Sequence, residues 1–108
     1  MSEITTQEMI NKLEVLQART RSLMGLVEGL KDKQSSKLIR ELAQWQFDAI
    51  EFIDMLSISN GNKTNVITLL SKMNLEYTTT YPFHIMDGYL LSIRTILDKI
   101  EEQNDEIS

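Results

Sequence analysis

The stretch SSKLIRELAQWQFDAIEFIDMLSI, residues 35–58, decides the fold. No Gly or Pro interrupts it, and its apolar residues recur at steps of four and three. The residues that form this stripe are Leu38, Leu42, Trp45, Ala49, Phe52 and Leu56. Such spacing places all of them on one face of a helix. Further isoleucines make the stripe wider than the roughly 100° that a surface helix needs, so we expect more than one neighbouring helix to cover it.

A first helix is predicted to run from residue 6 to about residue 32. Thr5 and Glu8 have the T-x-x-E spacing of a capping box, in which the threonine hydroxyl accepts a hydrogen bond from the first turn. A seam of residues then follows at heptad spacing: Met9, Leu13, Leu16, Thr20, Leu23, Val27 and Leu30. Thr20 is the polar member of this otherwise apolar seam, which is typical of helices that pack lengthwise.

Small residues mark the end of the first helix and the start of the central one. Gly25 and Gly29 lower helix propensity, and we expect them to let a neighbouring helix approach closely. The segment KDKQSS, residues 31–36, breaks the helix, and Ser35 or Ser36 is predicted to cap the next.

Two more helices are predicted in the second half of the chain. Asn60 and Gly61 stop the central helix, and Thr64 or Asn65 is expected to cap a short third one. A fourth helix is predicted to begin at Pro82 and to fade near residue 103. Its apolar seam consists of Phe83, Met86, Leu90, Ile93, Leu97 and Ile100.

These patterns predict an all-α fold, a compact helical bundle of three long helices and one short helix with antiparallel neighbours. The 108 residues have room for one domain, 1–108, with residues 1–4 and 104–108 frayed at its ends.

The composition excludes several classes of protein. The chain has no Cys, which removes disulfides and thiolate metal sites. Its first residues do not resemble a signal peptide, and no apolar run reaches the roughly 20 residues of a membrane span. We therefore expect a cytoplasmic protein that does not bind membranes.

The net charge of −5 is unevenly distributed. Residues 1–43 contain seven Lys or Arg against six Asp or Glu, whereas residues 44–108 contain four against ten. The acidic second half disfavours nucleic-acid binding, which requires phosphate neutralisation, and favours a protein partner with a basic surface.

His84 is the single histidine of the chain. The segment HIMDG, residues 84–88, resembles the reactive segment of histidine phosphotransfer domains, in which Lys and Gly follow the histidine at the third and fourth positions. Gly88 matches that pattern, but Asp87 stands in place of the lysine and would repel a phosphoryl group. We therefore interpret His84 as a structural or surface residue.

Glu51 and Asp54 form an E-x-x-D motif in the central helix. The motif resembles the second magnesium-binding motif of all-α nucleotide pyrophosphohydrolases, and carboxylates three residues apart share a helix face that can bind a hard cation. That family also has E-x-x-E on the preceding helix, where this chain has Glu28 and Lys31. The resemblance implies a magnesium-dependent nucleotide hydrolase, which we keep as the alternative function. The other interpretation is a solvated acidic edge.

Aromatic residues cluster near the start of the fourth helix: Tyr77, Tyr81, Phe83 and Tyr89. Tyrosine is enriched at interfaces, where one end of the ring is buried and the other is wet. The other interpretation is a local core that seals one end of the bundle.

The preferred function is a non-enzymatic protein–protein interaction module, an adaptor, inhibitor, immunity or assembly factor, with no cofactor and no metal site. The residues predicted to bind the partner are Tyr77, Tyr81, Phe83 and His84. Because the long helices carry so much apolar surface, we also expect a homodimer built on helix packing with two-fold symmetry.

Overall fold

The computed structural model describes residues 5–28, 35–56, 63–76 and 79–107, with side chains up to residue 103. These residues form four helices: α1 (Thr6–Glu28), α2 (Ser36–Met55), α3 (Lys63–Ser71) and α4 (Tyr81–Ile107). The predicted all-α bundle of three long helices and one short helix is confirmed.

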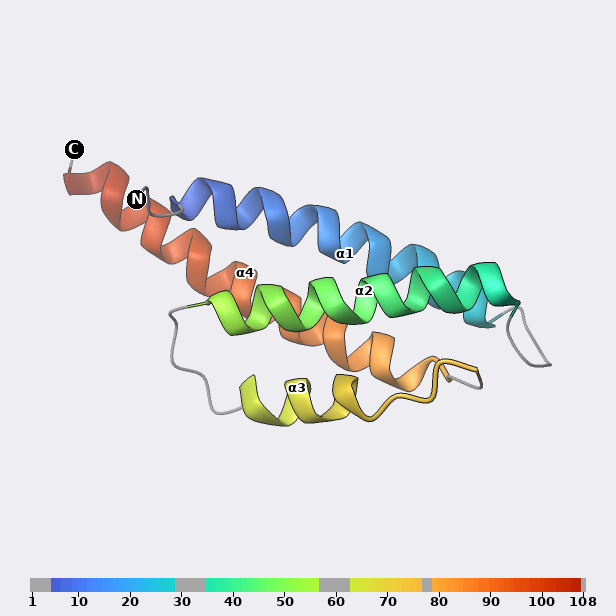
Figure 1. Cartoon of the computed structure of the whole chain (residues 1–108). Coiled ribbons are helices and arrows are strands. Elements are labelled where there is room, and N and C mark those ends of the chain that lie inside the picture. Colours follow the sequence, from blue (N-terminus) through green and yellow to red (C-terminus); the bar gives the residue numbers. More distant parts are fainter. Residues whose placement is uncertain (1–4, 29–34, 57–62, 77–78, 108) are drawn as a thin grey trace.

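Consecutive helices run in opposite directions, as Figure 1 shows. The α1 helix packs against α4 and α2, and α3 packs against α2 and α4. The four helices therefore form a closed ring in which α2 lies diagonally opposite α4. The molecule is elongated and measures 53 × 27 × 22 Å. The start of α1 and the end of α4 lie at the same end of it (Figure 1).

The two predicted helix caps of the first half are present. The backbone N–H of Glu8 donates to the hydroxyl of Thr5 over 3.1 Å. The backbone N–H of Leu38 donates to the hydroxyl of Ser35 over 3.2 Å, so Ser35 is the cap of α2. Each hydroxyl satisfies a backbone donor that the first turn of a helix leaves without a partner.

The start of α3 differs from the prediction. This helix begins at Lys63, which places Thr64 and Asn65 inside its first turn, so neither residue is the cap. The Lys63 ammonium group donates to the backbone carbonyl of Leu56 over 2.9 Å. This bond connects the start of α3 to the end of α2. Because it joins two separate elements, helix propensity alone does not predict it.

The α4 helix is longer than predicted at both ends. It begins at Tyr81, and the backbone N–H groups of Phe83 and His84 donate to the Thr80 carbonyl, each over 3.1 Å. Pro82 is thus the second helical residue, a position in the first turn where its missing N–H costs no hydrogen bond. The helix continues to Ile107, beyond the predicted end near residue 103.

The core follows the predicted stripes. Every residue of the central stripe is buried: Leu38, Leu42, Trp45, Ala49, Phe52 and Leu56. The ring of Trp45 stacks on the ring of Phe83 with centroids 4.6 Å apart, so α2 and α4 meet through side chains across the diagonal. The close packing of these large rings fills the centre of the bundle.

The predicted role of the glycines in α1 is wrong for Gly25. Gly25 is exposed, and a Cβ added there would meet no heavy atom within 4 Å. None of the described helices therefore approaches closely at this point. Gly29 lies outside the described residues.

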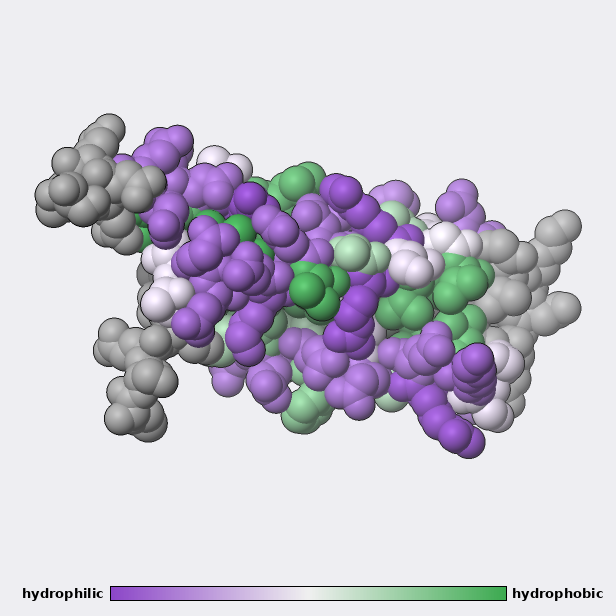
Figure 2. All heavy atoms as spheres, turned by 90° about the horizontal axis from the view of Figure 1, so that it is seen from above, coloured by the Kyte–Doolittle hydropathy of each residue, from purple (hydrophilic) through white to green (hydrophobic). Residues whose placement is uncertain are grey.

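The described surface is mainly polar. Figure 2 shows hydrophilic side chains over most of one face, with hydrophobic ones emerging between them. The large hydrophobic residues that remain exposed are Val15, Leu26, Phe47, Tyr81 and Leu91. Most of the described residues in the apolar seams of α1 and α4 are buried inside the chain. Met9 and Ile100, at the outer ends of these seams, are only partly buried, and Leu30 lies outside the described residues. A second copy would therefore have to bind mainly through other residues. None of the described helices combines the length and hydropathy that crossing a bilayer requires.

Candidate interaction surfaces

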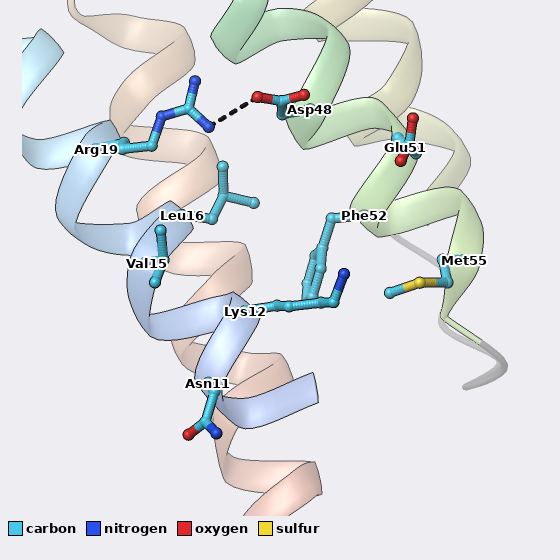
Figure 3. A pocket seen from close by; sticks show the side chains of 9 residues that line it. All are labelled: Asn11, Lys12, Val15, Leu16, Arg19, Asp48, Glu51, Phe52 and Met55. Carbon is cyan, nitrogen blue, oxygen red and sulfur yellow. Dashed lines mark hydrogen bonds and ion pairs between the residues drawn. The ribbon is translucent and has the colours of Figure 1, made fainter. Parts of the chain in front are cut away.

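A groove between α1 and α2 contains a hollow of about 380 Å³. Figure 3 shows its walls, with side chains of α1 on one side and of α2 on the other. The lining residues are Asn11, Lys12, Val15, Leu16, Arg19, Asp48, Glu51, Phe52 and Met55. The hollow therefore combines an apolar floor with charged groups of both signs, an arrangement suited to an amphipathic group.

An ion pair crosses one end of this groove. The Arg19 guanidinium donates to one carboxylate oxygen of Asp48 over 2.8 Å (Figure 3). The side-chain amide of Gln44 donates to the other oxygen over 3.0 Å. Both oxygens of Asp48 are therefore engaged within the protein. Because the pair is partly exposed, its contribution to the free energy of unfolding is small, about 0–1 kcal/mol.

The E-x-x-D motif lies on the outer part of α2. Glu51 lines the groove and Asp54 does not, and both side chains are exposed. The α1 side of the hollow carries the cations Lys12 and Arg19. Glu28 lies nine residues beyond Arg19, or roughly 14 Å along the helix. Among the described residues, no group of three or more Asp, Glu, His or Cys side chains is placed to hold a metal ion.

A second hollow of about 450 Å³ lies between α3 and α4. Its lining residues are Asn65, Val66, Leu69, Tyr81, Ile85, Gly88, Tyr89 and Ser92. None of these residues carries a formal charge, in contrast to the groove between α1 and α2. The hollow therefore favours an uncharged occupant.

The structure separates the four predicted partner-binding residues. Tyr81 is 55% exposed and lines the hollow between α3 and α4. His84 is also exposed. Phe83 is fully buried against Trp45, because it occupies the core-facing position of the first turn of α4. Its ring contributes to the core and offers no surface to a partner. Tyr77 lies outside the described residues.

Tyr89 has a buried position beside this hollow that the sequence analysis did not predict. It lines the same hollow and is only 6% exposed, and its hydroxyl has no hydrogen-bond partner in the described part of the chain. Burial raises the pKa of this phenol above its ordinary value of 10.0, because the ionised form loses hydration. A buried hydroxyl without a partner is unusual and calls for an explanation.

The aspartate next to Gly88 is engaged with α1. One carboxylate oxygen of Asp87 accepts from the Arg21 guanidinium over 2.9 Å and from the Gln17 amide over 3.4 Å. Asp87 thus connects α4 to α1. In histidine phosphotransfer domains a lysine stands at the position of Asp87. Here that position holds an acidic residue whose bonds join α4 to α1.

The fold and these two surfaces define a small antiparallel helical bundle with one amphipathic and one uncharged hollow. A comparison of the chain with known protein families, with curated proteins and with solved structures finds no match.

Proposed function

We propose that the chain is a non-enzymatic interaction module, such as an adaptor, inhibitor, immunity or assembly factor, that binds another protein through the start of α4. One observation supports this proposal above the others. The ring of Tyr81 is more than half exposed beside an uncharged hollow. Tyrosine is among the residues that contribute most to interface affinity, because a rigid ring buries much area with little loss of entropy.

The position of Tyr81 is fixed by the core beneath it. Pro82 and Phe83 follow directly and are buried, and the Phe83 ring stacks on Trp45. The backbone of this turn is bonded to the Thr80 carbonyl. An exposed ring on such a rigid support needs little ordering when a partner binds, which is favourable for affinity.

The charge of the chain favours a partner with a basic surface. Ten of the sixteen acidic residues lie after residue 43, against four basic ones. A complementary field speeds the encounter of two proteins more than it tightens the complex. A second copy of the chain is a further candidate for the partner.

Affinity capture from the native cell tests the proposal. The baits are the wild-type chain, Tyr81→Ala and Leu91→Ala. Leu91 is the matched control because it lies on the same helix and is 49% exposed, but does not line the hollow. We expect the wild-type and Leu91→Ala baits to retain the same partner and Tyr81→Ala to lose it. If all three baits retain the partner equally, Tyr81 does not contribute to the contact.

The alternative function is a magnesium-dependent nucleotide hydrolase. Its support is the resemblance of Glu51 and Asp54 to one acidic motif of that class. No further carboxylate within the described residues joins this pair, so the structure adds no observation in favour of the alternative.

A further inference from the structure

The groove between α1 and α2 extends beyond its hollow of about 380 Å³. A second hollow of about 280 Å³ lies between the same two helices. Its lining residues are Arg19, Ser22, Leu23, Leu26, Glu41 and Gln44. Arg19 lines both hollows, so they lie end to end, with the ion pair between Arg19 and Asp48 at their junction. Together they follow α1 from residue 11 to residue 26, which is roughly 22 Å of helix.

Both walls of this groove have residues at heptad spacing. The wall residues at steps of three and four are Lys12, Val15, Arg19, Ser22 and Leu26 on α1, and Glu41, Gln44, Asp48, Glu51 and Met55 on α2. A third helix that packs lengthwise between two helices contacts residues with this spacing. A peptide that binds by adding a strand would need a free sheet edge, and the described residues form helices without a strand. The shape of the groove therefore favours a helix as its occupant.

Each hollow offers an apolar contact to such a helix. Val15 is exposed in the first hollow and Leu26 is exposed in the second. The midpoints of the α1 residues that line the two hollows lie about eight residues apart, or roughly 12 Å. Seven residues of a partner helix span roughly 10 Å. One helix with apolar side chains at positions i and i+7 therefore reaches both hollows.

The unpaired charges of the groove differ between its two walls. Lys12 on α1 is exposed, as are Glu41 and Glu51 on α2. Within the described part of the chain none of these three forms an ion pair. Figure 3 shows Lys12 and Glu51 on the opposite walls of the first hollow. A helix with an acidic flank toward α1 and a basic flank toward α2 complements both walls, whereas the acidic α2 wall repels the phosphates of a nucleic acid.

We propose that the groove between α1 and α2 binds an amphipathic helix of another protein. Apolar side chains at positions i and i+7 of this helix enter the two hollows. Its acidic flank faces Lys12, and its basic flank faces Glu41 and Glu51. In the ring of helices the pair α1 and α2 lies opposite the pair α3 and α4. The groove is therefore separate from the surface of Tyr81, and the chain has one surface for each of two partners, as an adaptor requires.

Selection from a phage-displayed peptide library tests the proposal. The library consists of helical peptides of about 18 residues, or roughly 27 Å of helix, with randomised apolar stripes and flanks. The wild-type chain is the target. We expect the enriched peptides to have apolar residues at positions i and i+7, with acidic and basic residues on opposite flanks. The affinity of an enriched peptide for each variant is then measured by fluorescence anisotropy.

Substitutions in the groove should weaken the binding of that peptide. Val15→Asp and Leu26→Asp each place a carboxylate in one hollow, so each should weaken binding more than about 10-fold. Lys12→Glu should weaken it about 2- to 5-fold, and a lysine in place of the acidic peptide residue that faces this position should restore it. Phe47→Asp is the matched control and should bind like the wild-type chain. Phe47 is exposed on α2 but lines neither hollow.

Three results would overturn the proposal. The first is a selection that enriches no helical peptide. The second is a peptide that binds Val15→Asp and Leu26→Asp as tightly as the wild-type chain. The third is binding that only Val15→Asp weakens, because the occupant is then confined to the first hollow. Tyr81→Ala should bind the peptide like the wild-type chain. If it loses the peptide, the contact lies at the start of α4, which excludes the groove and supports the proposed function.

Discussion

The indole N–H of Trp45 donates a hydrogen bond to the hydroxyl of Thr20 over 2.9 Å, and both side chains are fully buried. The Thr20 hydroxyl donates in turn to the Leu16 carbonyl over 2.7 Å. The polar groups at the centre of the bundle therefore satisfy one another. Since the Trp45 ring also stacks on Phe83, this one residue of α2 joins α1 and α4.

Replacement of Thr20 by valine should destabilise the protein. Valine has nearly the same shape but lacks the hydroxyl, so the buried indole N–H of Trp45 loses its partner. We expect the free energy of unfolding in urea to fall by about 1–3 kcal/mol. Thr20→Ser is the control, because it keeps the hydroxyl and removes a methyl group, and its loss should be smaller. A valine variant as stable as the wild-type chain would show that this bond contributes nothing.

Leu42→Ala tests which face of α2 is the core. Leu42 is fully buried, so truncation should lower the free energy of unfolding by roughly 2–5 kcal/mol through lost burial and the cavity left behind. Phe47 lies on the same helix and is 61% exposed. Phe47→Ala should change the stability by no more than about 0.5 kcal/mol. A change below about 0.5 kcal/mol for Leu42→Ala would contradict the assigned core.

The sequence predicted the helices well because helical spacing is a local property. The stripe of α2 and the seam containing Thr20 were visible as residues three and four apart. The pairing of Thr20 with Trp45 was not, because it joins residues 25 positions apart and depends on how two helices pack. The bond between Lys63 and Leu56 was not predictable for the same reason, since it joins two separate elements.

The candidate site was predicted only in part. The cluster of aromatics predicted a contact surface at the start of α4, but it grouped Tyr81 with Phe83. These residues are two apart, which is about 200° around a helix, so one of them faces solvent and the other the core. The hollow between α3 and α4 results from packing between helices, and so does the burial of the Tyr89 hydroxyl, which has no partner among the described residues. The spacing of residues along the sequence does not show how separate helices pack.

Tyr89 should make stability depend on pH in the alkaline range. Burial raises the pKa of its phenol above 10.0 in the folded protein, so the fold favours the neutral form. This contribution to stability is complete below the unfolded pKa, near 10, and is lost as the pH rises through the higher folded pKa. The measurement compares the free energy of unfolding of the wild-type chain with that of Tyr89→Phe from about pH 8 to 12. The wild-type chain should lose stability relative to Tyr89→Phe as the pH rises. A difference that does not vary with pH would contradict the burial of this hydroxyl.

Magnesium binding separates the proposed function from the alternative. In a calorimetric titration with magnesium chloride, an interaction module should give no heat of binding beyond the heat of dilution. Glu51→Gln should behave identically. A hydrolase that uses the E-x-x-D motif should bind the ion through its carboxylates and lose that binding in Glu51→Gln. Saturable binding that this substitution abolishes would favour the hydrolase.

The most direct measurement compares the affinity and the thermal midpoint of Tyr81→Ala with those of the wild-type chain. The affinity is measured by titration with the protein that the wild-type bait captures. Because the ring is 55% exposed on a rigid helix start, we predict that binding weakens by more than about 1 kcal/mol and that the thermal midpoint stays nearly unchanged. A midpoint that falls in step with the affinity would show that Tyr81 is part of the core and would contradict its role as the contact residue.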